Sequence, residues 1–348
     1  MTTNDTSRAI GRWLALWAVM IALLVLIGGA TRLTESGLSI TEWQPVSGVI
    51  PPLGESAWAA EFAKYQRIPQ YQLLHQGMSL ADFKTIFLWE YVHRLWARLL
   101  GVALAIPLLW FAVRRRLPRE LWPRLTGLLV LLGLQGALGW WMVASGLSER
   151  TSVSQYRLAA HLVTALALYA FTVWTAAELI APRSGRAPNA DRSLNSGLVG
   201  LALLVPFTAA SGAFVAGLRA GKIYNTFPLM GAGLVPREYG QLTPWWRNLF
   251  ENPSAVQFNH RAIAMATFAL ALWVWYRGRK STNPGLPRAT RLVLYAAFVQ
   301  VALGIATLLT GVPIVLGVAH QAGALLLFTA ALLAMHASGG PRQVLSDP

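Results

Sequence analysis

The segment Glu90-Tyr-Val-His-Arg94 returns later in the chain as Gln257-Phe-Asn-His-Arg261. Two further matches follow in the same order. Gln135-Gly-Ala-Leu-Gly139 returns as Gln300-Val-Ala-Leu-Gly304, and Ala160-His161 returns as Ala319-His320. Three matches in one order are typical of an internal repeat, so we predict that the chain is a tandem duplication.

The composition predicts a membrane protein. Of the 348 residues, 55% are hydrophobic and 12% are charged, whereas soluble domains carry about 25% charged residues. This excludes an ordinary soluble enzyme, a disordered chain and a nucleic-acid-binding domain, so the net charge of +15 is assigned to loops facing anionic headgroups. The absence of cysteine excludes disulfides, iron–sulfur clusters and thiolate chemistry.

Long stretches without charge predict the membrane spans, since about 20 apolar residues cross a bilayer. Residues 13–31, 125–148, 158–177 and 193–218 each supply one helix, and residues 292–341 supply two, separated by a turn at 310–313. Two shorter stretches, 99–113 and 262–276, reach spanning length only when they are extended backwards through the repeated histidine segments. We therefore expect an all-α integral membrane protein, with eight transmembrane helices in two tandem parallel four-helix bundles.

The expected organisation is an N-terminal half (1–181) with a long outer loop (31–85), a cytoplasmic linker (182–195) and a C-terminal half (196–348). Basic residues concentrate in alternate short segments, beginning with Arg8 and Arg12, which predicts that both termini are cytoplasmic. The short segment before the first span does not resemble a mitochondrial transit peptide. We expect a bacterial cytoplasmic (inner) membrane location.

Four of the six histidines, His93, His161, His260 and His320, lie near the outer ends of predicted helices. One such histidine is more often a hydrogen-bonded interfacial residue, but four at equivalent places favour a function. Two histidines per bundle are too few for zinc or copper. Haem iron needs only two axial ligands, so we predict one haem between His93 and His161 and another between His260 and His320, both towards the periplasm.

Charged neighbours distinguish the two halves. Arg94 and Arg261 are candidate partners for haem propionates, although Arg94 could instead pair with Glu90 one turn earlier. Glu90 corresponds to the neutral Gln257. This asymmetry suggests that the first site does acid–base or cation-stabilising work while the second binds or relays electrons. The 15 tryptophans, Trp13 and Trp17 among them, are interpreted mainly as an interfacial belt.

The segments Gly28-Gly-Ala-Thr-Arg-Leu-Thr-Glu-Ser-Gly-Leu-Ser-Ile40 and Glu42-Trp-Gln-Pro-Val-Ser-Gly-Val-Ile-Pro-Pro52 resemble the first-loop signature of the haem A synthase family. The cysteine-free loops are similar to its mitochondrial and proteobacterial branch. The resemblance implies oxidation of the C8 methyl group of haem O to the formyl group of haem A for terminal oxidases. It also implies that Glu90 is an essential catalytic carboxylate, that His93 and His161 bind the substrate haem, and that His260 and His320 hold a resident haem B.

Two other functions stay open from the residues alone. A dihaem b-type membrane cytochrome would pass electrons from quinol without altering its haem, and a haem carrier would need no catalytic carboxylate. Expected partners are the lipid bilayer, haem O and an unidentified electron acceptor, in the membrane or in solution. Delivery of haem O by haem O synthase and assembly into a homo-oligomer are left open.

Overall fold

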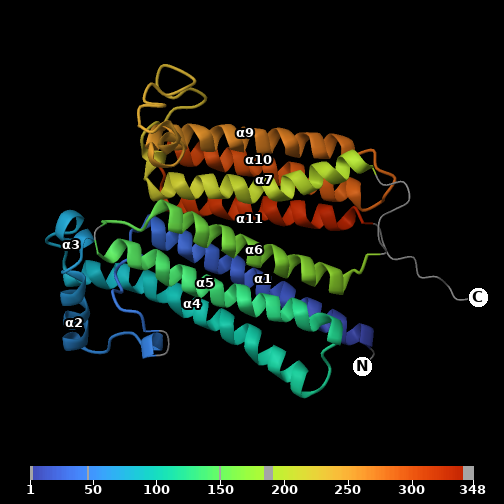
Figure 1. Ribbon diagram of the computed structural model, residues 1–348, viewed down its shortest axis with the longest axis horizontal. Coiled ribbons are helices and arrows are strands. Elements are labelled where there is room, and N and C mark those ends of the chain that lie inside the picture. The colour runs from blue at the N-terminus through green and yellow to red at the C-terminus, as the bar shows by residue number, and fades with distance from the viewer. Residues whose placement is uncertain (1–2, 45–46, 149, 184–190, 340–348) are drawn as a thin grey trace, which may run out of the picture.

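The computed structural model describes residues 3–44, 47–148, 150–183 and 191–339, which form helices and no β-strand. In this part of the chain eight α-helices have 24 or more residues: α1 (Thr3–Leu33), α4 (Leu80–Val113), α5 (Trp122–Leu147), α6 (Gln155–Ile180), α7 (Arg192–Gly217), α9 (Pro253–Gly278), α10 (Leu286–Leu309) and α11 (Ile314–Ala337). They run roughly side by side along the long axis of the molecule (Figure 1). A helix of 24 residues is about 36 Å long, which exceeds the hydrocarbon thickness of a bilayer.

Seven of these helices are long and apolar enough to cross a membrane, so the prediction of an all-α membrane protein is confirmed at that level. The exception among the long helices is α9. Its first turns contain Gln257, Asn259, His260 and Arg261, which lower its hydropathy. The eighth span therefore stays a prediction.

Capping side chains define where several helices begin. The side chains of Ser79, Asp191 and Asn252 accept hydrogen bonds from backbone N–H groups in the first turns of α4, α7 and α9. Such caps satisfy donors that have no partner within the helix. The starts of α4 and α9 thus precede the repeated histidine segments, so both segments are helical.

The helices pack in two sets. In the first half, α1 to α6, helix α1 packs against α4 and α6, and α5 packs against α6. In the second half, α7 to α11, helix α7 packs against α9 and α11, and α10 packs against α11. The halves meet where α1 and α6 contact α7 and α11. The two halves differ in one helix pair. Helix α9 packs along α10, whereas the equivalent helices α4 and α5 make few contacts.

A salt bridge joins the two halves at the end of α1 and α7. Glu35 and Arg219 each lie two residues beyond the end of their helix, and both have left-handed backbones, with φ of 57° and 53°. The Arg219 Nη2 atom is 3.0 Å from Glu35 Oε2. Beside this pair, Arg32 Nη2 donates to the carbonyl oxygen of Ala216 at 2.8 Å.

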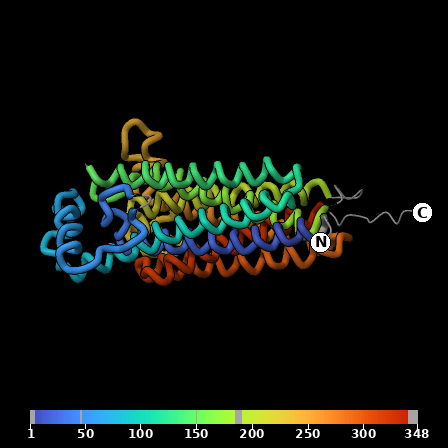
Figure 2. The backbone as a smooth tube through the Cα atoms, turned by 90° about the horizontal axis from the view of Figure 1, so that it is seen from below, coloured from blue at the N-terminus to red at the C-terminus, as the bar shows by residue number. Residues whose placement is uncertain are grey.

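The long connections gather at one end of the molecule, and α1 begins and α11 ends at the opposite end (Figures 1 and 2). The first connection is shorter than the expected loop 31–85, since α1 extends to Leu33 and α4 begins at Leu80. It contains α2 (Glu55–Tyr65) and α3 (Pro69–Leu74). Of the expected linker 182–195, residues 184–190 lie outside the described residues, and residues 192–195 already belong to α7.

The interfacial interpretation of Trp17 is wrong. Its side chain is 1% exposed, and Nε1 donates to the carbonyl oxygen of Leu100 at 2.9 Å. Trp13 donates in the same way to Ala103 at 3.0 Å. Both indoles therefore lie between α1 and α4. Each N–H group finds a carbonyl acceptor on α4, whereas lipid would offer it none.

Candidate functional site

Each of the four repeated histidines packs against a glycine of a neighbouring helix. A methyl group built at that glycine would lie 2.9–3.2 Å from an imidazole atom, tighter than ordinary contacts. The pairs are Gly28 with His93, Gly139 with His161, Gly212 with His260, and Gly304 with His320. A side chain at any of these glycines would therefore have to push the ring away from the helix backbone.

The rings form one pair in each half. His93 lies near His161, and His260 lies near His320. The Nδ1 atom of His260 lies 2.8 Å from Ser211 Oγ, whereas Nδ1 of His320 is buried without a hydrogen-bond partner. The described residues contain no group of three or more His, Cys, Asp or Glu that could hold a metal ion. Two imidazoles in each half, and a ring nitrogen of His320 without a partner, fit a haem with two axial ligands better than a zinc or copper ion.

Glu90 is the most completely bonded carboxylate of the first half. The residue is 2% exposed. Its Oε2 atom accepts hydrogen bonds from Ser39 Oγ at 2.7 Å and from the backbone N–H of Ile40 at 2.9 Å. Its Oε1 atom accepts from Arg94 Nη2 at 2.6 Å. Arg94 Nε also donates to Oε1, at 3.1 Å, so three residues hold this side chain in one buried position, one helical turn before His93.

Arg94 binds the first connection as well as Glu90. Its Nη2 atom donates to the carbonyl oxygen of Ile40 at 2.9 Å, and its Nη1 atom to that of Glu42 at 3.1 Å. The ion pair with Glu90, the alternative considered for Arg94, is present. A propionate role for Arg94 stays a prediction, and it would have to share this guanidinium with the connection.

The second half repeats the arrangement with different chemistry. Arg261 Nη2 donates to the carbonyl oxygen of Tyr224 at 2.7 Å, and Nη1 donates to that of Thr226 at 2.9 Å. Gln257 donates to Tyr224 as well, at 3.0 Å, and its own Oε1 is buried without a partner. Glu90 thus accepts hydrogen bonds from its connection whereas Gln257 donates to its own. At this position of the repeat, only the first half has an acidic residue. The propionate role of Arg261 stays a prediction.

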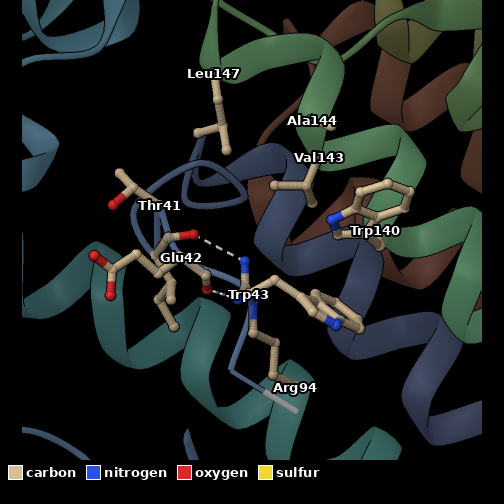
Figure 3. A pocket seen from close by; sticks show the side chains of 9 residues that line it. Thr41, Glu42, Trp43, Arg94, Trp140, Val143, Ala144 and Leu147 are labelled. Carbon is tan, nitrogen blue, oxygen red and sulfur yellow. Dashed lines mark hydrogen bonds between the residues drawn. The ribbon is translucent and has the colours of Figure 1, made fainter.

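A pocket opens beside Arg94, between the first connection and α5 (Figure 3). Its cavity volume is about 80 Å³, and it is partly open at the surface of the molecule. Arg94 lies between Glu42 and Trp43 of the connection and Trp140 and Val143 of α5 (Figure 3). The pocket gives the outer end of the first half a cavity bounded by a cation and indole rings.

The α1 helix also touches the second half beside this site. Gln321, which directly follows His320, donates from Nε2 to the carbonyl oxygen of Val25 at 3.1 Å. Its side chain fills the place where a side chain on Gly29 would lie. Adjacent glycines of α1 therefore contact His93 of the first half and Gln321 of the second.

Comparison with known proteins decides the family. A family profile described as "Cytochrome oxidase assembly protein" (COX15-CtaA) matches residues 11–332. The chain belongs to this family. The match extends from α1 into α11, so it includes all the histidines of the two pairs.

Curated relatives in this family are similar over almost their whole length. The chain is 47% identical over 334 residues to the "Heme A synthase" of Parvibaculum lavamentivorans, covering 96% of this chain and 95% of that protein. It is 52% identical over 330 residues to the "Heme A synthase" of Chelativorans sp., covering 93% and 90%. For the "Heme A synthase" of Brucella ovis the values are 48% over 345 residues, covering 97% and 94%. The resemblance inferred from the first-loop signature is confirmed.

Some residues of the site were not found from the sequence. The repeat located the histidines, and helical spacing located Arg94 beside Glu90. The donors Ser39 and Ile40 were missed, because their contact with Glu90 is made across the fold. Gly139 and Gly304 could have been found from the sequence, since each is the last residue of the second repeated segment.

Proposed function

We propose that this chain is a haem A synthase, an oxidoreductase that converts the C8 methyl group of haem O into the formyl group of haem A. The observation that carries this proposal is identity of 47–52% to proteins of that name over nearly the full chain. The two histidine pairs agree with it, because each offers two ligands to an iron whose other ligands come from the porphyrin. Terminal oxidases would receive the product.

We infer that all eight long helices span the membrane as two tandem parallel bundles. The repeated packing of α1 with α4 and of α7 with α9 supports this, as do the matched positions of Glu35 and Arg219. The segments at the end where α1 begins include Arg114, Arg115 and Arg116, which favours that end as cytoplasmic. The histidine pairs would then lie towards the periplasmic side of a bacterial inner membrane.

The two halves take different haems in this proposal. His93 and His161 would hold the iron of haem O, and His260 and His320 would hold a resident haem B, which supplies one-electron transfer. Ser211 orients the ring of His260 through its 2.8 Å contact with Nδ1 and leaves the other ring nitrogen for a ligand. The four glycines let the rings reach their positions without displacing a helix.

Glu90 would provide a fixed negative charge beside the substrate. Arg94, Ser39 and Ile40 hold its carboxylate in one position, so no reorganisation is needed when positive charge develops nearby. The connection that supplies Ser39 and Ile40 also covers the carboxylate and keeps it out of bulk water. The neutral Gln257 would leave the second half to electron relay.

The substitution Glu90→Gln tests this role. We expect haem A and its alcohol precursor to fall about 10²–10⁴-fold, while haem O still binds between His93 and His161. The readout is the haem extracted from protein purified from cells that produce haem O, identified by chromatography and mass. Glu55→Gln, which removes an exposed carboxylate of the first connection, is the control and should keep its product. Full activity in Glu90→Gln would remove Glu90 from the mechanism.

The same extraction from the unaltered protein tests the whole proposal. Haem A or its alcohol beside haem B supports a haem A synthase. Haem B alone, at two per chain, would identify a dihaem cytochrome that passes electrons from quinol. Haem O that exchanges freely and never changes, with Glu90 dispensable, would identify a haem carrier.

A further inference from the structure

An aromatic pair closes the second half where the first half has two glycines. The rings of Phe268 on α9 and Phe298 on α10 pack edge to face, with centroids 5.1 Å apart. When the repeated segments are superimposed on each other, Gly101 of α4 takes the place of Phe268, and Gly133 of α5 takes the place of Phe298. The aromatic contact that packs α9 against α10 therefore has no counterpart between α4 and α5.

The space beside these glycines is open. A methyl group built at Gly101 or Gly133 would meet no atom within 4 Å. The α4 and α5 helices make few contacts, whereas α9 packs along α10. Nearby side chains are apolar and half exposed, Val102 by 50% and Leu134 by 46%. The seam between α4 and α5 is thus an apolar space that faces the surrounding lipid.

The seam lies along the two helices that carry His93 and the glycine packed on His161. Gly101 lies about 12 Å along α4 from His93, and Gly133 lies about 9 Å along α5 from Gly139, which contacts His161. The pocket is lined from the same two helices, by Arg94 of α4 and by Trp140 and Val143 of α5. A molecule held between His93 and His161 could extend a long apolar group inward between α4 and α5.

We propose that the seam between α4 and α5, with Gly101 and Gly133 at its walls, binds the long isoprenoid chain of the substrate haem and admits that chain sideways from the bilayer. This inference rests on the proposed function, which gives the first half a substrate bearing such a chain. Haem B has no isoprenoid chain, and the half assigned to it is the half that Phe268 and Phe298 close. The seam would therefore decide which haem each half accepts.

The double variant Gly101→Phe/Gly133→Phe, which gives the first half the aromatic pair of the second, tests the proposal. Full-length protein is purified from cells that produce haem O, and its haems are extracted and counted per chain. We expect haem O plus haem A to fall at least tenfold, while one haem B per chain stays bound. Leu203→Phe adds the same ring at an exposed position of α7, outside the seam, and should leave the haem content unchanged.

The converse variant Phe268→Gly/Phe298→Gly should admit haem O to the second half, so that haem B per chain falls as haem O rises. Haem O plus haem A at the unaltered level in Gly101→Phe/Gly133→Phe would overturn the proposal. If that variant does not accumulate, Gly133→Phe alone decides in the same way, because position 133 is exposed. Unaltered protein with no haem O or haem A would instead overturn the proposed function, and the seam's role with it.

Discussion

At the scale of single residues, the contacts between glycine and histidine are the feature most open to test. In Gly139→Val, the added Cβ would lie 3.2 Å from His161 Cε1, so the ring must shift. We expect the variant to lose the haem of the first half and keep that of the second, halving the total haem per chain. Gly200→Val on α7 is the control, since a Cβ there makes only an ordinary contact, 3.7 Å from the side chain of Leu270. Unchanged haem in Gly139→Val would show that the ring position is not required.

The histidines and the glycines differ in how far they could be predicted. Each histidine is polar in an apolar stretch and recurs in the repeat, so the sequence singled it out. Gly28 is one of 30 glycines, and its importance depends on which ring lies opposite on another helix. Similarly, the contact of Arg94 with Glu90 follows from helical spacing, but the contact of Ser39 with Glu90 depends on the path of a connection.

Among the elements, the connection after α7 depends on Arg261. Replacing this residue by Met removes its hydrogen bonds to the carbonyl oxygens of Tyr224 and Thr226, and each lost bond destabilises by about 1–3 kcal/mol. We expect faster amide hydrogen exchange in residues 224–231 without loss of the helices. Arg247→Met, which removes only an exposed ion pair with Glu251, should leave that exchange unchanged. Equal exchange in the two variants would contradict the role of Arg261.

The start of α7 responds to pH. The hydrogen bond from Ser193, followed by that from Arg277, lowers the pKa of Asp191 to about 2. Because the pKa is lowered in the folded protein, its stabilising contribution is complete above the unfolded value of about 3.9 and is lost as pH falls to about 2. The thermal midpoint of the unaltered protein should therefore exceed that of Asp191→Asn at pH 5, and the difference should shrink by pH 2. A difference independent of pH would rule out the charged form as its cause.

Elements with uniform apolar runs were predictable, and those with mixed patterns less so. Helix α6 follows from an uninterrupted apolar stretch. Helix α9 begins with polar residues, so its extent came only from the comparison of the repeated segments. The short helices α2 and α3 were not predicted, because they lie on the outer ends of other helices and have no spanning length.

At the scale of the whole molecule, Glu35 and Arg219 join the halves by one exposed ion pair. Glu35→Arg or Arg219→Glu alone puts like charges together and should lower the thermal midpoint, whereas the double exchange should restore it. Pairs of this exposure contribute about 0.2–1 kcal/mol, so the shift will be small and should shrink in high salt. A double variant no more stable than the weaker single one would show that the pair does not couple the halves.

The duplication stays a prediction from three short sequence matches. The difference between the α4–α5 and α9–α10 pairs was not predicted. It depends on which residues of two helices meet, as Phe268 and Phe298 do, and no single segment of sequence shows that. Similarity between halves can therefore be predicted from sequence before their specialisation can.

The adjacent glycines of α1 have a consequence for both halves. Gly28 lies against His93, and Gly29 lies against Gln321, the neighbour of His320. One turn of α1 therefore touches His93 of one pair and the direct neighbour of His320 in the other. A bulky substitution at Gly28 or Gly29 is for this reason expected to disturb packing next to both pairs, although each glycine belongs to the first half of the chain.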